Sequence, residues 1–156
     1  MAEIVNEIVE RLTWLYRRVR IITPGTKSSI NLEDTGWIKE YEDLLQIVAK
    51  YLLKMKTMPH LKGFNMLKHA VFLKIVSARA FFNGKILYES LGKVHDEKFT
   101  LIESCLRHCV NQAYDSGGLK ELNKIFGTVV IDDKIPPTNL QLISLIAEGI
   151  IYCEEG

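Results

Sequence analysis

The 156-residue sequence lacks the features that mark several classes of protein. No apolar run approaches the roughly 20 residues of a membrane-spanning helix, and the first residues are too charged for a secretory signal. The three cysteines, Cys105, Cys109 and Cys153, have no paired spacing, which predicts free thiols in a reducing compartment. These absences predict a soluble cytoplasmic protein with no membrane partner.

Enzyme motifs are missing as well. The sequence contains no phosphate-binding glycine loop, no GxSxG and no HExxH motif. One candidate metal group, His108 with Cys105 and Cys109, lacks a fourth ligand, and its cysteines also suit helix packing. We therefore predict no catalytic residues, no metal and no cofactor.

Acidic residues are absent from a long central segment. Between Leu44 and Tyr88 there is no Asp or Glu. The same window contains eight basic residues, so its charge of +8 contrasts with a net charge of +1 for the whole chain. Because the window is also apolar it has to fold, and folding gathers some of these cations into a field that attracts phosphate. The alternative is that long lysine side chains extend to solvent from a hydrophobic helix.

Apolar residues recur at helical spacing along most of the chain, which predicts an all-α single domain, residues 1–156, of six or seven helices. Residues 1–33 are expected to form a helix followed by a flexible loop, and residues 127–137 a connection with one short strand-like piece. Thr35 and Thr138 are predicted helix caps. The helices are expected at about 2–21, 36–52, 64–82, 85–92, 97–114, 119–126 and from 139 onward.

Five cations of the acid-free window are candidate phosphate ligands. Lys74 falls within the apolar stripe of its helix, where a charge needs a partner, and an external anion is a natural one. Lys68 and Arg79 are eleven residues apart and share one helix face. His60 and Lys62 belong to the loop before this helix, and a basic loop at a helix N-terminus favours phosphate binding.

Arg107 and His108 are a further basic pair, on the fifth predicted helix. Adjacent helical residues point about 100° apart, so we expect only one of the two to face the core. A single histidine in such a place is more often structural than catalytic.

Residues 58–114 resemble the C-terminal domain of the large subunit of archaeal and eukaryotic DNA primases. The resemblance rests on an ordered series of short motifs: Pro59-His60, Phe72-Leu73-Lys74, Asp96-Glu97-Lys98-Phe99, Arg107-His108 and Tyr114. That family binds an iron–sulfur cluster through four cysteines, whereas this chain has three. It is therefore most similar to a cluster-free form, such as the accessory subunit of crenarchaeal primases.

This resemblance implies a non-catalytic subunit that works beside the catalytic small subunit and the large subunit of a primase in DNA replication. The domain would bind a nucleoside triphosphate or the 5′ end of the RNA primer on template DNA. His60, Lys74, Arg107 and His108 match the family's binding residues, and Lys62 or Lys68 would replace an arginine that has no match.

Two other functions fit the same basic surface. A helical adaptor, such as a small CRISPR-effector subunit or a viral protein, would bind a nucleic-acid backbone without reading sequence. A protein-interaction bundle would show no affinity for phosphate.

Overall fold

The structure is a computed structural model that describes residues 2–21, 34–127 and 134–155. These residues form seven α-helices and no strand, which confirms the predicted all-α class and helix number. The helices are α1 (Ala2–Arg17), α2 (Gly36–Lys54), α3 (Lys62–Val76), α4 (Gly84–His95), α5 (Phe99–Asp115), α6 (Gly118–Phe126) and α7 (Asn139–Glu155).

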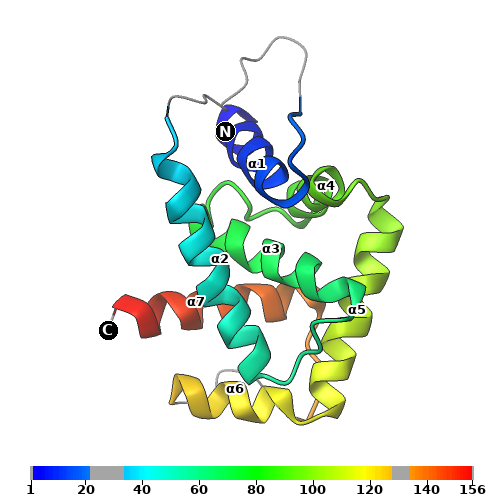
Figure 1. Ribbon diagram of the computed structural model, residues 1–156. Coiled ribbons are helices and arrows are strands. Elements are labelled where there is room, and N and C mark those ends of the chain that lie inside the picture. The colour runs from blue at the N-terminus through cyan, green and yellow to red at the C-terminus, as the bar shows by residue number, and fades with distance from the viewer. Residues whose placement is uncertain (1, 22–33, 128–133, 156) are drawn as a thin grey trace.

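Helix α3 lies at the centre of the fold (Figure 1), between α2 on one side and α5 on the other, with α7 crossing near it. Its sequence KGFNMLKHAVFLKIV is apolar around most of its circumference, so it has to be covered on several sides. Phe72 and Leu67 are fully buried there. The central helix is thus the core of the molecule.

Helix α1 packs along α4 at one end of the fold (Figure 1). Ile8, Val9 and Leu12 give α1 an apolar face that is buried. The Trp14 ring meets the Trp37 ring of α2 edge-on, with centroids 5.9 Å apart. Helix α1 therefore contacts both α4 and α2, which follow it in the sequence.

Several helix ends differ from the prediction, each for a local reason. Helix α1 ends at Arg17 rather than near residue 21, because Arg18 adopts a left-handed conformation with φ 59°. Helix α3 ends at Val76 and not at Phe82, since Ser77 leaves helical geometry and its hydroxyl accepts a hydrogen bond from the Ala80 N–H at 3.1 Å. Both ends of α3 are thus offset toward the N-terminus.

The predicted short helix from Lys85 is longer than expected. Asn83 caps it by accepting a hydrogen bond from the Lys85 N–H at 2.8 Å, and the helix continues past Gly92 to His95. Asp96, which we expected near the N-terminus of the next helix, instead closes α4 in a left-handed conformation with φ 53°. The next helix begins only at Phe99.

The two predicted caps have different outcomes. Thr35 precedes α2 but makes no side-chain cap hydrogen bond, so that detail is wrong. Thr138 caps α7 as predicted, because its hydroxyl accepts from the Gln141 N–H at 3.2 Å while the Gln141 side chain accepts from the Thr138 N–H at 3.0 Å. The expected loop of residues 22–33 and strand-like piece over 128–133 lie outside the described residues. No described helix is both long and apolar enough to cross a membrane.

Candidate functional site

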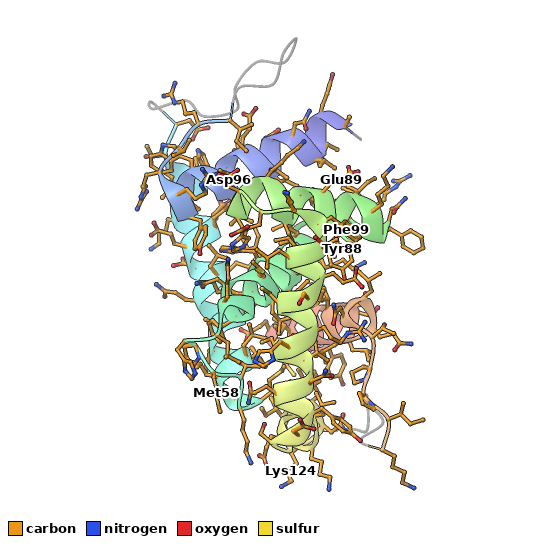
Figure 2. The ribbon with its side chains drawn as sticks, turned by 90° about the vertical axis from the view of Figure 1, so that its right-hand side faces the viewer. Met58, Tyr88, Glu89, Asp96, Phe99 and Lys124 are labelled. Atoms are coloured by element: carbon orange, nitrogen blue, oxygen red, sulfur yellow. The ribbon has the colours of Figure 1, made fainter. Side chains whose placement is uncertain are left out.

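Helices α4 and α5 form a helix–turn–helix pair. Only Asp96, Glu97 and Lys98 separate them, a length typical of this motif. The N–H of Glu97 donates to the Gly92 carbonyl at 3.0 Å, which folds the turn back onto the end of α4. In Figure 2, α4 lies across the upper end of α5, and α5 runs down the face toward the viewer.

The pair is held in place by packing on its inner side. Leu91 of α4 and Ile102 of α5 are fully buried. The rings of Tyr88 and Phe99 meet edge-on with centroids 5.0 Å apart (Figure 2). At Gly63 of α3 an added Cβ would lie 2.2 Å from the Cys105 carbonyl oxygen, so α3 approaches the backbone of α5 more closely than any other residue would permit. The core therefore fixes the orientation of α5.

The outer side of α5 presents a continuous polar face. Its members are exposed and recur at three- and four-residue intervals, so they share one side of the helix. They are Thr100, Glu103, Ser104, Arg107, His108 and Asn111. We call these six residues the α5 polar face.

Two segments flank the α5 polar face. On one side is the loop of residues 55–61, where the Gln112 side chain donates to the Lys56 carbonyl at 2.8 Å and accepts from the Met58 N–H at 3.2 Å. On the other side Tyr114 donates to the Lys134 carbonyl at 3.0 Å, and Asn139 donates to the Glu103 carbonyl at 3.2 Å. Hydrogen bonds therefore hold a backbone segment on each side of the α5 polar face.

Four of the seven predicted site residues lie around α5. Arg107 and His108 are both exposed on it, which corrects the expectation that one of them faces the core. Helix α5 is buried instead through Leu106 and Cys109, the residues on either side of the pair. His60 is exposed in the flanking loop. Lys62 lies at the start of α3 and binds Glu97 in the turn, with 2.8 Å between Nζ and Oε1.

The N-terminus of α3, predicted as an open phosphate site, abuts α5. Gly63 is buried against Cys105, and the amine of Lys62 already has a carboxylate partner. The basic loop before α3 thus contributes to the surroundings of α5 rather than to a separate pocket.

The other predicted site residues lie elsewhere. Lys62 and Lys74 are at opposite ends of α3, twelve residues or roughly 18 Å apart. The half-buried Lys74 donates to the Phe81 carbonyl at 3.4 Å and lies 5.9 Å from the Phe82 ring centroid, so its partners are internal. Arg79 is exposed just beyond that end of α3. Lys68 lines a cleft with residues of α1 and α2. The seven residues therefore do not converge on one pocket.

A pair of histidines, His69 buried and His95 half-buried, lies behind the turn. Nδ1 of His69 on α3 and Nε2 of His95 at the end of α4 are 2.9 Å apart, and the Tyr16 ring packs on both rings. Burial lowers the pKa of His95 to about 4 and that of His69 well below 6.5. Both rings are therefore neutral near pH 7, and one donates its N–H to the other.

The cysteines show no site chemistry in the described residues. All three are free, and burial raises the pKa of Cys109 to about 11, which keeps its thiol protonated. No group of three His, Cys, Asp or Glu side chains in the described ranges is arranged to hold a metal ion.

The chain matches a known protein family. Residues 48–150, about two thirds of the chain, match the family described as sporulation initiation factor Spo0A C terminal. The chain belongs to this family. The matched residues include α3, α4, α5 and α6, whereas α1 and the first part of α2 precede them.

This match overturns the resemblance to primases. The Spo0A C-terminal family is a helical DNA-binding domain of a sporulation response regulator. The predicted primase subunits, nucleoside triphosphate, primer and replication role are therefore wrong. The alternative of a helical nucleic-acid-binding protein fits the family better, and a non-enzymatic domain agrees with it.

Most of the α5 polar face was not predicted from the sequence. Arg107 and His108 were predicted from their basic charge, whereas the uncharged Thr100, Ser104 and Asn111 and the acidic Glu103 were not. The signal was present in the apolar positions of α5, whose complement is the polar face.

Proposed function

We propose that this chain is a DNA-binding domain in which α5 enters the major groove and reads sequence through its polar face. The observation that carries the proposal is the α4–turn–α5 pair with an exposed polar stripe on its second helix. In helix–turn–helix proteins the second helix lies in the major groove while the first crosses the backbone. Membership in the Spo0A C-terminal family supports the same function.

The α5 polar face has side chains of the types that read base edges. An arginine such as Arg107 can donate two hydrogen bonds to guanine, and an asparagine such as Asn111 can bond adenine at two positions. Glu103 can accept a hydrogen bond from the amino group of cytosine, and Ser104 and Thr100 suit either role. A surface that bound only the backbone would need cations rather than this mixture.

Contacts to phosphate would come from the edges of the face. Lys98 is exposed immediately before α5, and Lys93 is exposed near the end of α4. His60 is exposed in the flanking loop. Because only a few cations border the face, we expect weak binding to random DNA and a modest dependence on salt.

The test begins with selection of preferred duplexes from a random library, followed by fluorescence anisotropy on a selected and a scrambled duplex. Arg107→Ala should weaken binding to the selected duplex by about 1–3 kcal/mol and relax the preference at one base pair. Lys50→Ala is the control, because Lys50 is exposed on α2 and outside the α5 polar face. Helix α2 lies on the other side of α3 from α5 (Figure 1), so this variant should bind as the wild type does.

Two results would contradict the proposal. One is the absence of any preferred sequence after selection. The other is an Arg107→Ala protein, folded by circular dichroism, that binds the selected duplex as tightly as the Lys50→Ala protein does.

A further inference from the structure

A cleft of about 140 Å³ opens between α1, α2 and α3, away from the α5 polar face. Its lining comes from three helices: Leu12, Leu15 and Tyr16 of α1, Glu42 and Leu45 of α2, and Lys68 and His69 of α3. Five of these residues precede residue 48, so the family match does not account for the cleft. It is a feature of this chain's N-terminal helices.

Lys68 is the polar residue that most needs explanation. Its side chain is half-buried, and burial lowers the pKa of its amine. Within the described residues its amine has no hydrogen bond and no ion pair, and Glu42, which lines the same cleft, is not within ion-pair distance. A cation that is withdrawn from water without an acid partner is unfavourable, and a bound anionic group would relieve that cost.

The rest of the lining limits what the anion can belong to. Leu12, Leu15 and Leu45 provide an apolar wall, which suits an aliphatic group. Glu42 adds a separate negative charge, which repels a simple anion but attracts a ligand that also carries an ammonium group. The cleft is well below the roughly 300–1,000 Å³ of larger ligand sites, so a nucleotide would not fit.

We propose that this cleft binds a small aliphatic α-amino acid, with its carboxylate on Lys68, its ammonium group on Glu42 and its side chain against the leucines. The two unlike charges on the cleft and the apolar wall between three helices match the three parts of such a molecule. Tyr16 and His69 complete the cleft and limit its size. This site is separate from the DNA-reading surface, so it does not depend on the proposed function.

Isothermal titration calorimetry on the full chain tests the proposal with leucine as the probe. Two analogues isolate the charges: 4-methylpentanoate lacks the ammonium group, and isoamylamine lacks the carboxylate. Leucine should bind saturably, and each analogue at least about tenfold more weakly, because each leaves one charged partner unused. Lys68→Met and Glu42→Gln should each weaken leucine binding to a similar extent.

The control variants are Lys50→Met and Glu40→Gln, which remove the same charges from exposed positions on α2 outside the cleft and should bind leucine normally. Because Glu42 is exposed, Glu42→Gln should fold even if Lys68→Met does not. The proposal is overturned if leucine does not bind, if 4-methylpentanoate binds equally well, or if Glu42→Gln leaves the affinity unchanged. Lys68→Met should bind DNA as the wild type does. If leucine does not bind the cleft, the proposed DNA-binding function is therefore unaffected.

Discussion

Helices α3 and α5 carry similar polar residue types but play different parts in the fold. Helix α3 is buried around most of its surface, and nine of its fifteen residues are buried. Helix α5 buries five of its seventeen residues, all on one side. Each has a histidine and basic residues. On α3, His69 is buried against His95 and Lys74 is half-buried on the Phe81 carbonyl, whereas Arg107 and His108 of α5 are exposed.

The difference shows that the charge of a segment does not reveal where that charge is presented. Lys62, Lys68 and Lys74 leave α3 at three different places because neighbouring helices cover the rest of it. On α5 one side is free, so even uncharged side chains form a continuous surface. The proposed function therefore rests on the helix with an uncovered face rather than on the helix with more cations.

The largest expected effect comes from opening the core at α3. Phe72 is fully buried, and its ring meets the Tyr41 ring with centroids 4.9 Å apart. Phe72→Ala should lower the free energy of unfolding by about 3–5 kcal/mol, because a cavity remains where the ring was. Ser104→Ala on the α5 polar face should change it by less than about 0.5 kcal/mol. Urea denaturation measures both, and similar losses would contradict the contrast between the helices.

The second prediction compares the histidine pair behind the turn, His69 of α3 and His95 of α4, with His108 of α5 across pH. Burial lowers the pKa of His95 from 6.5 to about 4, with Lys68, Arg17 and Lys62 adding to the effect and Glu97 opposing it. Its partner His69 on α3 is lowered by burial, by His95 and by Lys68. Between pH 6.5 and about 4 the unfolded chain binds a proton at His95 that the folded chain does not bind. The free energy of unfolding is therefore highest above pH 6.5 and decreases as the pH falls toward 4.

The loss from His95 should be of the order of 3 kcal/mol over that window. His95→Gln should flatten the dependence of the unfolding free energy on pH. His108→Gln, on the exposed face of α5, is the matched control for the loss of a histidine. Equal slopes for the two variants between pH 6.5 and about 4 would show that the histidine pair does not set the pH response.

The third prediction concerns the contact between the two helices. Alanine at Gly63 would place a Cβ 2.2 Å from the Cys105 carbonyl oxygen, and neither backbone can move aside easily. Gly63→Ala should therefore destabilise the protein by about 1–3 kcal/mol, although alanine favours helices. Gly36→Ala at the start of α2 meets only the Asp34 side chain, at 3.8 Å, and should be neutral or stabilising. Thermal unfolding of the two variants separates the clash from helix propensity.

The fold could be predicted from the sequence better than the candidate site could. Helical periodicity is local, so the all-α class, the number of helices and the Thr138 cap could be predicted. The end of a helix depends on whether a single residue keeps or leaves the helical conformation, and helical periodicity does not show this. Ser77 ends α3 early, and Asp96 ends α4 in a left-handed conformation, and neither signal is strong in the sequence.

The site was harder to predict because it is defined by what other helices leave uncovered. The acid-free window was a real anomaly of composition, but its residues are distributed by packing. Of its candidate phosphate ligands, His60 in the loop before α3 and Lys62 at the start of α3 lie beside the α5 polar face. A resemblance built on short ordered motifs led to a primase, whereas a match over residues 48–150 identified the family.

The smallest expected effect is at Lys74, which was predicted to bind an external anion from within the apolar stripe of its helix. Its amine makes one long hydrogen bond, at 3.4 Å, and lies 5.9 Å from the Phe82 ring. Lys74→Met keeps the aliphatic stem and removes only these two weak contacts, so the free energy of unfolding should fall by no more than about 1 kcal/mol. Its affinity for the selected duplex should stay within about twofold of the wild type, against the much larger loss at Arg107. Anisotropy titrations of Lys74→Met and Arg107→Ala on one duplex decide between the helices, and a larger loss at Lys74 would return the binding surface to α3.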